Sequence, residues 1–486
     1  MPTNYSIPGV YVEEVSKFPP AVAQVETAIP VFIGYTEFRL DANGGTLAQD
    51  TPVRISSLTE YETRFGNAPR LTVTEVRLDA DNNFLGATIS TSFYMHHALE
   101  MFYANGGGDC YIVSVGASGD YSGGYNSGEI LSGINAIELV DEPTIICFPD
   151  AAGNADAGIS NSLQVRALQL CAELGDRVTI CDTLSADPLG ATFRNEIGIN
   201  NLKYGAAYTP WFNATFAKNV TFRELSGGIF NRAGVAGQQL EALTTDSDTV
   251  TQIGAYRTNL GTETEAQLAD REVDLLNNFG LYKAVVAGIN ALTIPMPPSG
   301  AIAGVYATVD RTRGVWKAPA NVSLNLVDEP ATSFTQGQLA NLNIDPVAGK
   351  SINAIRRFTG KGVLVFGART LAGNDNEWRY ISVRRFYNMV EESVKKATEQ
   401  FVFEPNDANT WVRVQAMIEN FLTLQWRAGA LQGAKQEHAF QVAVGLGKTM
   451  TADDILNGRM IVQIAMAPVR PAEFIILRFE QKMPES

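Results

Sequence analysis

The stretch Gly445-Leu446-Gly447-Lys448-Thr449 has the residue types of a phosphate-binding loop, in which glycine amides and a lysine surround the phosphates of a nucleotide. Such a loop also needs a glycine five residues before Gly447, and that position holds Val442. It further needs a helix directly after the loop, whereas the residues after Thr449 predict only a short turn before a strand. We therefore interpret this stretch as a β-turn between two strands and expect no nucleotide cofactor.

Histidine is a common metal ligand and general base, and the chain has only three: His96, His97 and His438. Neighbouring residues on a helix point in different directions, so His96 and His97 are not expected to bind one metal ion together. We expect His97 on the core face of its helix and His96 on the exposed face. The GxSxG and HExxH motifs of hydrolases are absent, and no spacing among the acidic residues singles out a pair. The sequence thus predicts no catalytic, cofactor-binding or metal-binding residues.

The composition describes a globular protein with enough residues for two or three domains. Hydrophobic residues make up 45% and charged residues 18% of the 486 positions. The net charge of −15 argues against nucleic-acid binding, which depends on clustered lysine and arginine. The four cysteines form no CxxC pair, which predicts reduced core thiols and synthesis in the cytoplasm. The N-terminal residues lack the features of a signal peptide, and no apolar run approaches 18 residues, so we expect no membrane insertion.

The middle of the chain alternates between strand and helix patterns. Thr144–Phe148 and Val178–Cys181 are typical of buried strands, and Leu163–Leu174 has the apolar spacing of a helix. This order predicts an α/β (mixed α+β) fold with a mainly parallel sheet covered by helices. Residues 215–292 are more polar, with one predicted helix at 263–277, and we expect an insertion or surface lobe there.

The last third of the chain predicts strands at Gly362–Phe366 and Tyr380–Arg384, followed by two helices. The first helix spans Arg385–Phe401, and the second runs from Asp407 to a stop at Gly429.

Both ends of the chain carry strand patterns. Apolar side chains alternate at Val462, Ile464 and Met466, and again over 475–479. A similar short alternation spans Val10–Val15. Pattern alone favours strands that fold back onto their own domain, as most terminal strands do. The alternative is that these strands pair with strands of neighbouring subunits.

Several stretches together resemble the tail sheath family of contractile phage tails and contractile injection systems. The most specific is PPSGAIAGVYATVDRTRGVWKAPAN at 297–321, which is long and rich in constrained glycine and proline. The others are PGVYVEEV, TAIPVFIGYTE, ALEMFYANGGGDCYIVSVG, AAYTPWF, INAIRRFTGKGVLVFGARTL, ISVRRFYNMVEESVKKATEQFVFEPND and LNGRMIVQIAMAPVRPAEFIILRF. They are distributed over nearly the whole chain, with 215–292 as the main part that has no counterpart.

The resemblance implies a structural protein and not an enzyme. Members of this family form a helical polymer of stacked hexameric rings around an inner tube, and contraction from a metastable extended state drives the tube through a target membrane. The implied partners are further copies of the chain, the inner tube protein, and baseplate and tail-terminator or cap proteins, without nucleic acid. The implied place is a phage tail (a virion component) or phage-tail-like particle, assembled in the bacterial cytoplasm, that is released or acts outside the cell.

The resemblance also implies a domain layout and the residues that join subunits by strand exchange. An N-terminal arm (1–22) and a C-terminal strand arm (461–486) flank an inner domain (23–115 and 344–460), with an outward α/β domain at 116–343. The implied inter-subunit strand residues are Val10, Tyr11, Val12, Glu13, Val15, Phe474, Ile475, Ile476, Leu477 and Phe479. The candidate tube contacts are Lys395, Lys396, Arg413 and Arg427, on two helices between which the sequence does not choose.

The sequence leaves several points open. It does not distinguish a phage tail from a toxin-delivery particle, and it does not reveal the payload, the target or the trigger of contraction. A capsid or baseplate protein remains an alternative, as does a hydrolase carried on the middle α/β domain.

Overall fold

The computed structural model describes residues 21–116, 121, 124–154 and 156–478. The chain forms two compact units. Unit 1 contains Met389–Val469 together with residues up to Val25, and unit 2 contains Glu26–Asn388 together with the residues from Arg470 on. The chain passes from unit 2 into unit 1 within one helix, α13 (Ile381–Thr398). Among the described residues, no helix is both long and apolar enough to cross a membrane.

The described part of unit 2 is built on a nine-stranded sheet of order β13-β16-β15-β8-β7-β6-β1-β5-β2. The strands are β1 (Pro30–Tyr35), β2 (Pro52–Ile55), β5 (Cys110–Val115), β6 (Ile145–Cys147), β7 (Val178–Asp182), β8 (Gly205–Thr209), β13 (Val322–Ser323), β15 (Ile352–Phe358) and β16 (Gly362–Phe366). The central strands β15 to β5 run parallel, and β2, β16 and β13 pair antiparallel at the two sides. This arrangement confirms the expected α/β fold with a mainly parallel sheet.

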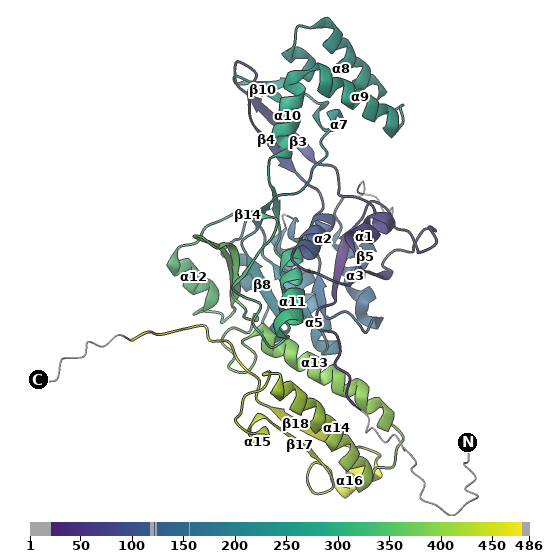
Figure 1. Cartoon of the computed structure of the whole chain (residues 1–486), viewed down its shortest axis with the longest axis vertical. Helices are drawn as coiled ribbons and strands as arrows, with labels where there is room; N and C mark the ends of the chain where they lie inside the picture. The colour runs from purple at the N-terminus through teal and green to yellow at the C-terminus, as the bar shows by residue number, and fades with distance from the viewer. Residues whose placement is uncertain (1–20, 117–120, 122–123, 155, 479–486) are drawn as a thin grey trace, which may run out of the picture. The chain divides into compact units, whose positions relative to one another are not determined.

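Helices cover both faces of this sheet, because successive side chains of a strand point to opposite faces. Phe32 packs on the side of α2 (Met95–Ala104) and α11 (Ser299–Arg313), whereas Val31 and Ile33 pack on the side of α3 (Ser127–Ala136) and α5 (Ala157–Leu174). Figure 1 shows α2, α11 and α5 around this sheet. The four cysteines are buried within these two cores, as expected for reduced structural thiols.

The helices α2 and α11 approach so closely that only glycine fits at their contact. A side-chain Cβ at Gly300 would lie 2.4 Å from the carbonyl oxygen of Ala98, and one at Gly304 would lie 2.5 Å from that of Phe102. Both glycines belong to the glycine-rich stretch 297–321. Its composition therefore reflects a close helix packing.

Residues 72–90 and 220–290 form a lobe with a hydrophobic core of its own. Its four-stranded sheet has the order β11-β10-β3-β4, with β3 (Thr72–Leu78), β4 (Phe84–Ser90), β10 (Phe230–Arg232) and β11 (Val235–Gln238). Its helices are α7 (Phe222–Leu225), α8 (Ser247–Asn259), α9 (Glu265–Asn278) and α10 (Gly280–Asn290). The expected surface lobe and its helix at 263–277, which is α9, are present, but further helices were not predicted and pack buried Leu240, Ile253 and Tyr282 against the distant β3–β4 hairpin.

Smaller elements complete unit 2. A three-stranded sheet joins β9 (Phe212–Ala214), β12 (Ile294–Met296) and β14 (Val327–Pro330). Short helices lie at α1 (Leu58–Phe65), α4 (Pro149–Ala152), α6 (Ala191–Glu196) and α12 (Gln336–Asn343).

Unit 1 packs helices against a two-stranded sheet. α14 (Ala408–Arg427) starts at Asp407, whose side chain accepts a hydrogen bond from the amide of Thr410, and ends before Gly429 as expected. The strands β17 (Phe440–Val444) and β18 (Val462–Met466) pair antiparallel, and α15 (Gln436–Ala439) and α16 (Ala452–Leu456) flank them.

Two expectations differ from the structure. Tyr380–Arg384 is not a strand, because α13 begins at Ile381 and its first turn is buried on every side, which removes the helical periodicity. The expected boundaries at 115/116 and 343/344 do not separate compact units, because β1, β5 and β15 belong to the same sheet as β6–β8.

Candidate functional site

The C-terminal segment Arg470–Arg478 is anchored to the rest of unit 2 mainly at Glu473, and Arg470 Nη1 also donates to the carbonyl of Asn376 at 2.7 Å. The carboxylate of Glu473 accepts hydrogen bonds from Arg369 Nε at 2.8 Å and Nη2 at 2.5 Å, and from the Tyr380 hydroxyl at 3.1 Å. Arg369 is almost completely buried, so its guanidinium depends on this partner. Burial and the Glu473 carboxylate together raise the pKa of the Tyr380 hydroxyl, which keeps it a hydrogen-bond donor.

Directly after this anchor, four large apolar side chains are exposed. Phe474, Ile475, Ile476 and Leu477 have 67%, 80%, 78% and 72% of their surface accessible. Residues 474–478 form no strand ladder with any described residue. Consecutive exposed apolar residues of this size mark a surface that another protein covers. Their exposure agrees with a strand that is not folded onto its own chain.

Unit 1 offers a sheet that could accept such a segment. Within the described residues it has only the strands β17 and β18, so each strand has one side without a neighbouring strand. In β18, Val462, Ile464 and Met466 are only partly buried, although they form its apolar face. The expected alternation over 462–466 is therefore confirmed, with its apolar face incompletely covered.

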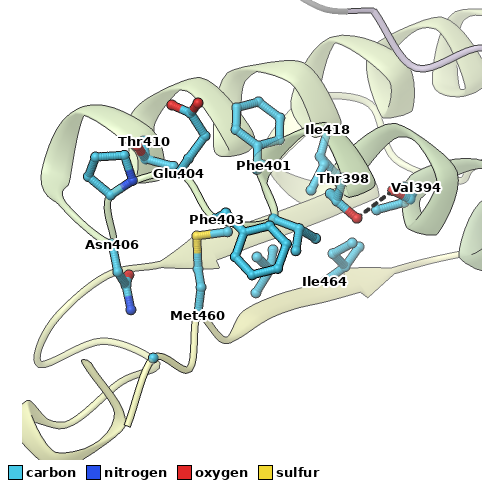
Figure 2. Close-up of a pocket in the computed structure, with 14 residues that line it drawn as sticks. Val394, Thr398, Phe401, Phe403, Glu404, Asn406, Thr410, Ile418, Met460 and Ile464 are labelled. Carbon is cyan, nitrogen blue, oxygen red and sulfur yellow. Dashed lines mark hydrogen bonds between the residues drawn. The ribbon is translucent and has the colours of Figure 1, made fainter. Parts of the chain in front are cut away.

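A groove of about 820 Å³ runs along this face of β18. Figure 2 shows Phe403 between Met460 and Ile464, with Phe401 and Ile418 above them. Phe403 is fully exposed and has a left-handed backbone conformation (φ 69°), which a bulky residue rarely adopts. The groove is lined by Val394, Thr398, Phe401, Val402, Phe403, Glu404, Pro405, Asn406, Thr410, Ile418, Gly458, Met460, Val462 and Ile464.

The four basic candidates do not form one cluster. Lys395 and Lys396 lie in the last turn of α13, and both approach the buried carboxylate of Glu392, at 3.2 Å and 3.5 Å. Arg413 lies near the same end, with its guanidinium 5.7 Å from the ring centre of Phe401. Arg427 is exposed at the other end of α14, 14 residues and hence about 21 Å further along the helix.

Some predicted residues lie outside the described part of the chain. These are Val10, Tyr11, Val12, Glu13 and Val15 of the N-terminal arm, and Phe479 of the C-terminal arm.

The Gly445–Thr449 stretch is a turn between strands, as predicted. The amide of Lys448 donates to the carbonyl of Gly445, and that of Gly447 donates to the carbonyl of Met450. The helix that follows, α16, has only five residues.

The prediction of a core position is confirmed for His97, whereas the prediction of an exposed position for His96 was wrong. His96 and His97 are both buried, and both reach Glu100 on the next turn of α2. The cause is the length of the imidazole side chains, which bend towards the residue three and four positions ahead. Burial opposes ionisation of the Glu100 carboxyl, but the two rings outweigh it and lower its pKa to about 2.

One family model matches both the C-terminal segment and the Met389–Val469 part of unit 1. Residues 373–482 match the family model described as the phage tail sheath C-terminal domain. The whole chain is similar to the sheath of an extracellular contractile injection system (PVC) in the contracted state, with 28% identity, a TM-score of 0.60 and 99% of each chain covered. The chain is therefore similar to tail sheath proteins along nearly its whole length.

Other relatives agree with this similarity. The chain is 29% identical to the helical sheath of the anti-feeding prophage (AFP) in the contracted state, with a TM-score of 0.61 over 98% of this chain and 100% of the other. It is 23% identical over 211 residues (41% of its length) to the tail sheath protein of Vibrio phage KVP40, and 27% identical over 119 residues (24%) to that of Enterobacteria phage T4. These matches cover only 28% and 17% of the two phage proteins, so the chain spans less than a third of these curated relatives.

Proposed function

We propose that this chain is the repeating structural subunit of a contractile sheath. The observation that carries this proposal is the likeness, along 99% of both chains, to a contracted sheath of an extracellular contractile injection system. Copies of the chain polymerise as stacked six-fold rings around an inner tube, in a phage tail or phage-tail-like particle assembled in the bacterial cytoplasm. Contraction from a metastable extended state drives the tube through a target membrane, and the subunit performs no catalytic step.

We further propose that the sheath contacts a baseplate at one end and a terminator or cap protein at the other. Baseplate contact is supported by a 29% identical chain, with a TM-score of 0.61, in a structure described as the anti-feeding prophage baseplate.

Subunits are joined by strand exchange in this proposal. The C-terminal residues Phe474–Phe479 of one copy add a strand to the β17–β18 sheet of a neighbour, and Val10–Val15 does the same at another contact. Three features of the described residues support the C-terminal part: an exposed apolar segment, a sheet of only two strands and an uncovered apolar groove. Alternation places Ile475 and Leu477 on one face of the added strand, where they can fill a groove.

Strand exchange explains how the polymer stays connected while its subunits move. The main-chain hydrogen bonds of an added strand do not depend on how the rest of each subunit is oriented. The extended arrangement is kinetically trapped, and the contracted one buries more complementary surface, so each subunit releases free energy on contraction.

We propose that unit 1 carries the contact with the tube. The candidate tube contact is the end of unit 1 where α13 meets α14, because Lys395, Lys396 and Arg413 gather there. Arg427 lies at the opposite end of α14 and is not part of this contact.

Negative-stain electron microscopy of the chain purified alone tests the proposed function. The expected result is hollow cylinders of stacked rings. Monomers that persist at high protein concentration would contradict the proposal, and closed shells would indicate a capsid protein instead.

A further inference from the structure

The helix α2 presents three metal-ligand side chains towards one cavity, outside the surfaces described above. The cavity has a volume of about 530 Å³, and His96, His97 and Glu100 line it together with Glu62 of α1. One nitrogen from each ring and one Glu100 oxygen all lie within 4.8 Å of one another.

The separations are close to those of a metal coordination shell. His97 Nδ1 lies 2.6 Å from Glu100 Oε2, and His96 Nδ1 lies 3.5 Å from the same oxygen. Ligand atoms bound to tetrahedral Zn²⁺ at about 2.0–2.2 Å are roughly 3.3 Å apart. A side-chain shift of less than about 1 Å, which opens the His97–Glu100 contact, would therefore admit an ion.

His96 supplies a second and independent indication. Its side chain is only 6% exposed, and neither ring nitrogen has a hydrogen-bond partner among the described residues. A buried polar group without a partner loses its hydration without compensation. A metal bond at Nδ1 would satisfy one nitrogen. The other nitrogen, Nε2, lies 3.5 Å from Glu62 Oε1, which resembles the carboxylate–histidine–metal arrangement that fixes a ligand ring.

We propose that His96, His97 and Glu100 bind a divalent transition-metal ion of the Zn²⁺ class, with Glu62 orienting His96. Two imidazoles and one carboxylate favour such an ion over Mg²⁺ or Ca²⁺, which prefer oxygen ligands only. The cavity provides room for water at the fourth coordination position.

The place of this site in the fold indicates a structural role. The cavity is also lined by Pro69–Leu71, which lead into β3, and by Ala217–Val220, which lead into α7, so it lies where the chain enters the lobe. The ring of His97 stacks on Phe216, with ring centres 4.4 Å apart. A metal ion that fixes the His97 ring would hold α2 against this connection. It would stabilise the junction between the lobe and the nine-stranded sheet, independently of the proposed sheath function.

Metal titration of the full chain tests the proposal. After removal of metal with a chelator, Zn²⁺ binding is measured by calorimetry, and Co²⁺ is used as a probe whose visible absorption reports nitrogen and oxygen ligands. The expected result is one equivalent bound. His96→Gln, His97→Gln and Glu100→Gln each weaken binding at least about 100-fold, and Glu62→Gln weakens it about 10–100-fold.

His438→Gln is the matched control, because His438 is the remaining histidine and lies exposed beside Glu437. It should bind Zn²⁺ as the unaltered chain does. Far-UV circular dichroism verifies that each variant is folded, and Glu100→Gln is the variant least expected to disturb packing because it keeps the side-chain shape. The proposal is overturned if the unaltered chain binds no Co²⁺, or if His97→Gln and folded Glu100→Gln bind it as tightly as His438→Gln does.

Discussion

Arg369 and Glu473 form a two-point salt bridge, with Nε to Oε1 at 2.8 Å and Nη2 to Oε2 at 2.5 Å. Arg369 also donates to the carbonyls of Asn343 and Gly373. These two carbonyls and the Glu473 carboxylate together fix the position of the guanidinium. The C-terminal segment therefore leaves unit 2 from a fixed point. The four large exposed apolar side chains of this segment, Phe474–Leu477, follow that point in sequence.

Replacing Glu473 with Gln should destabilise unit 2 by about 3 kcal/mol, because it leaves the buried Arg369 guanidinium without a counter-charge. Urea unfolding measures this loss. Glu377→Gln, at an exposed position close in sequence to Tyr380, is the control and should change stability by less than about 0.5 kcal/mol. Equal midpoints for the two variants would show that the salt bridge does not hold the segment.

Gly300→Ala should destabilise the protein by about 1–3 kcal/mol, because its methyl group would collide with the backbone of α2 at Ala98. Gly337→Ala is the matched control: it is also helical, and a Cβ there meets no atom within 4 Å. That control should raise stability slightly, by about 0.5–1 kcal/mol. The melting temperatures of the two variants distinguish these outcomes. A Gly300→Ala variant with an unchanged melting temperature would refute the close packing of α2 and α11.

Asp182 should make unit 2 more stable at mildly acidic pH. Burial raises the pKa of its carboxyl to about 7, although the Ser299 amide donates to it at 2.8 Å. Because the pKa is raised in the folded state, the stabilisation from protonation is complete below the unfolded pKa of about 4 and is lost as the pH rises through 7. The unfolding free energy should therefore increase as the pH falls from 8 to 5.

Asp182→Asn should flatten this pH dependence, since the amide oxygen still accepts from Ser299 but does not titrate. Buried Trp211, whose indole donates to the carbonyl of Thr183, provides a fluorescence signal close to the site. Asp81→Asn, in an exposed turn, should retain the pH dependence of the unaltered chain. An unchanged slope in Asp182→Asn would assign the dependence to another group, for example Asp150, whose pKa burial raises to about 6.

Arg413→Ala and Arg427→Ala distinguish the two ends of α14 as the tube contact. Arg413→Ala should lower the fraction of tubes covered by sheath several-fold when both proteins are mixed, whereas Arg427→Ala should not. Electron microscopy of the mixtures measures this fraction. If Arg427→Ala lowered the fraction of covered tubes and Arg413→Ala did not, the tube contact would lie at the other end of the helix.

Local sequence patterns predicted the elements whose ends are determined by residues close in sequence. β16 has the predicted bounds, and α14 begins and ends at the predicted cap residues, because apolar runs and capping residues act within a few positions. A surface lobe was expected at 215–292, but its inclusion of residues 72–90 was missed for the opposite reason. Its sheet pairs β3 with β10, more than 140 residues later, and no local pattern reveals such a pairing.

The candidate site was predictable in part. The alternation over 475–479 and the resemblance together indicated an exchanged strand, and the exposure of Phe474–Leu477 agrees with that hypothesis without testing it. The salt bridge of Glu473 with Arg369, 104 residues earlier, was not predictable, and neither was the convergence of His96 and His97 on Glu100. Each depends on side-chain conformations that only the folded structure defines.

The most direct test compares the full chain with a chain that ends at Glu473, which keeps the salt bridge but lacks the exposed strand. Both are examined by circular dichroism and negative-stain electron microscopy at the same concentration. We predict cylinders from the full chain and folded monomers from the shortened one. Cylinders from the shortened chain would contradict strand exchange at the C-terminus as the contact that builds the sheath.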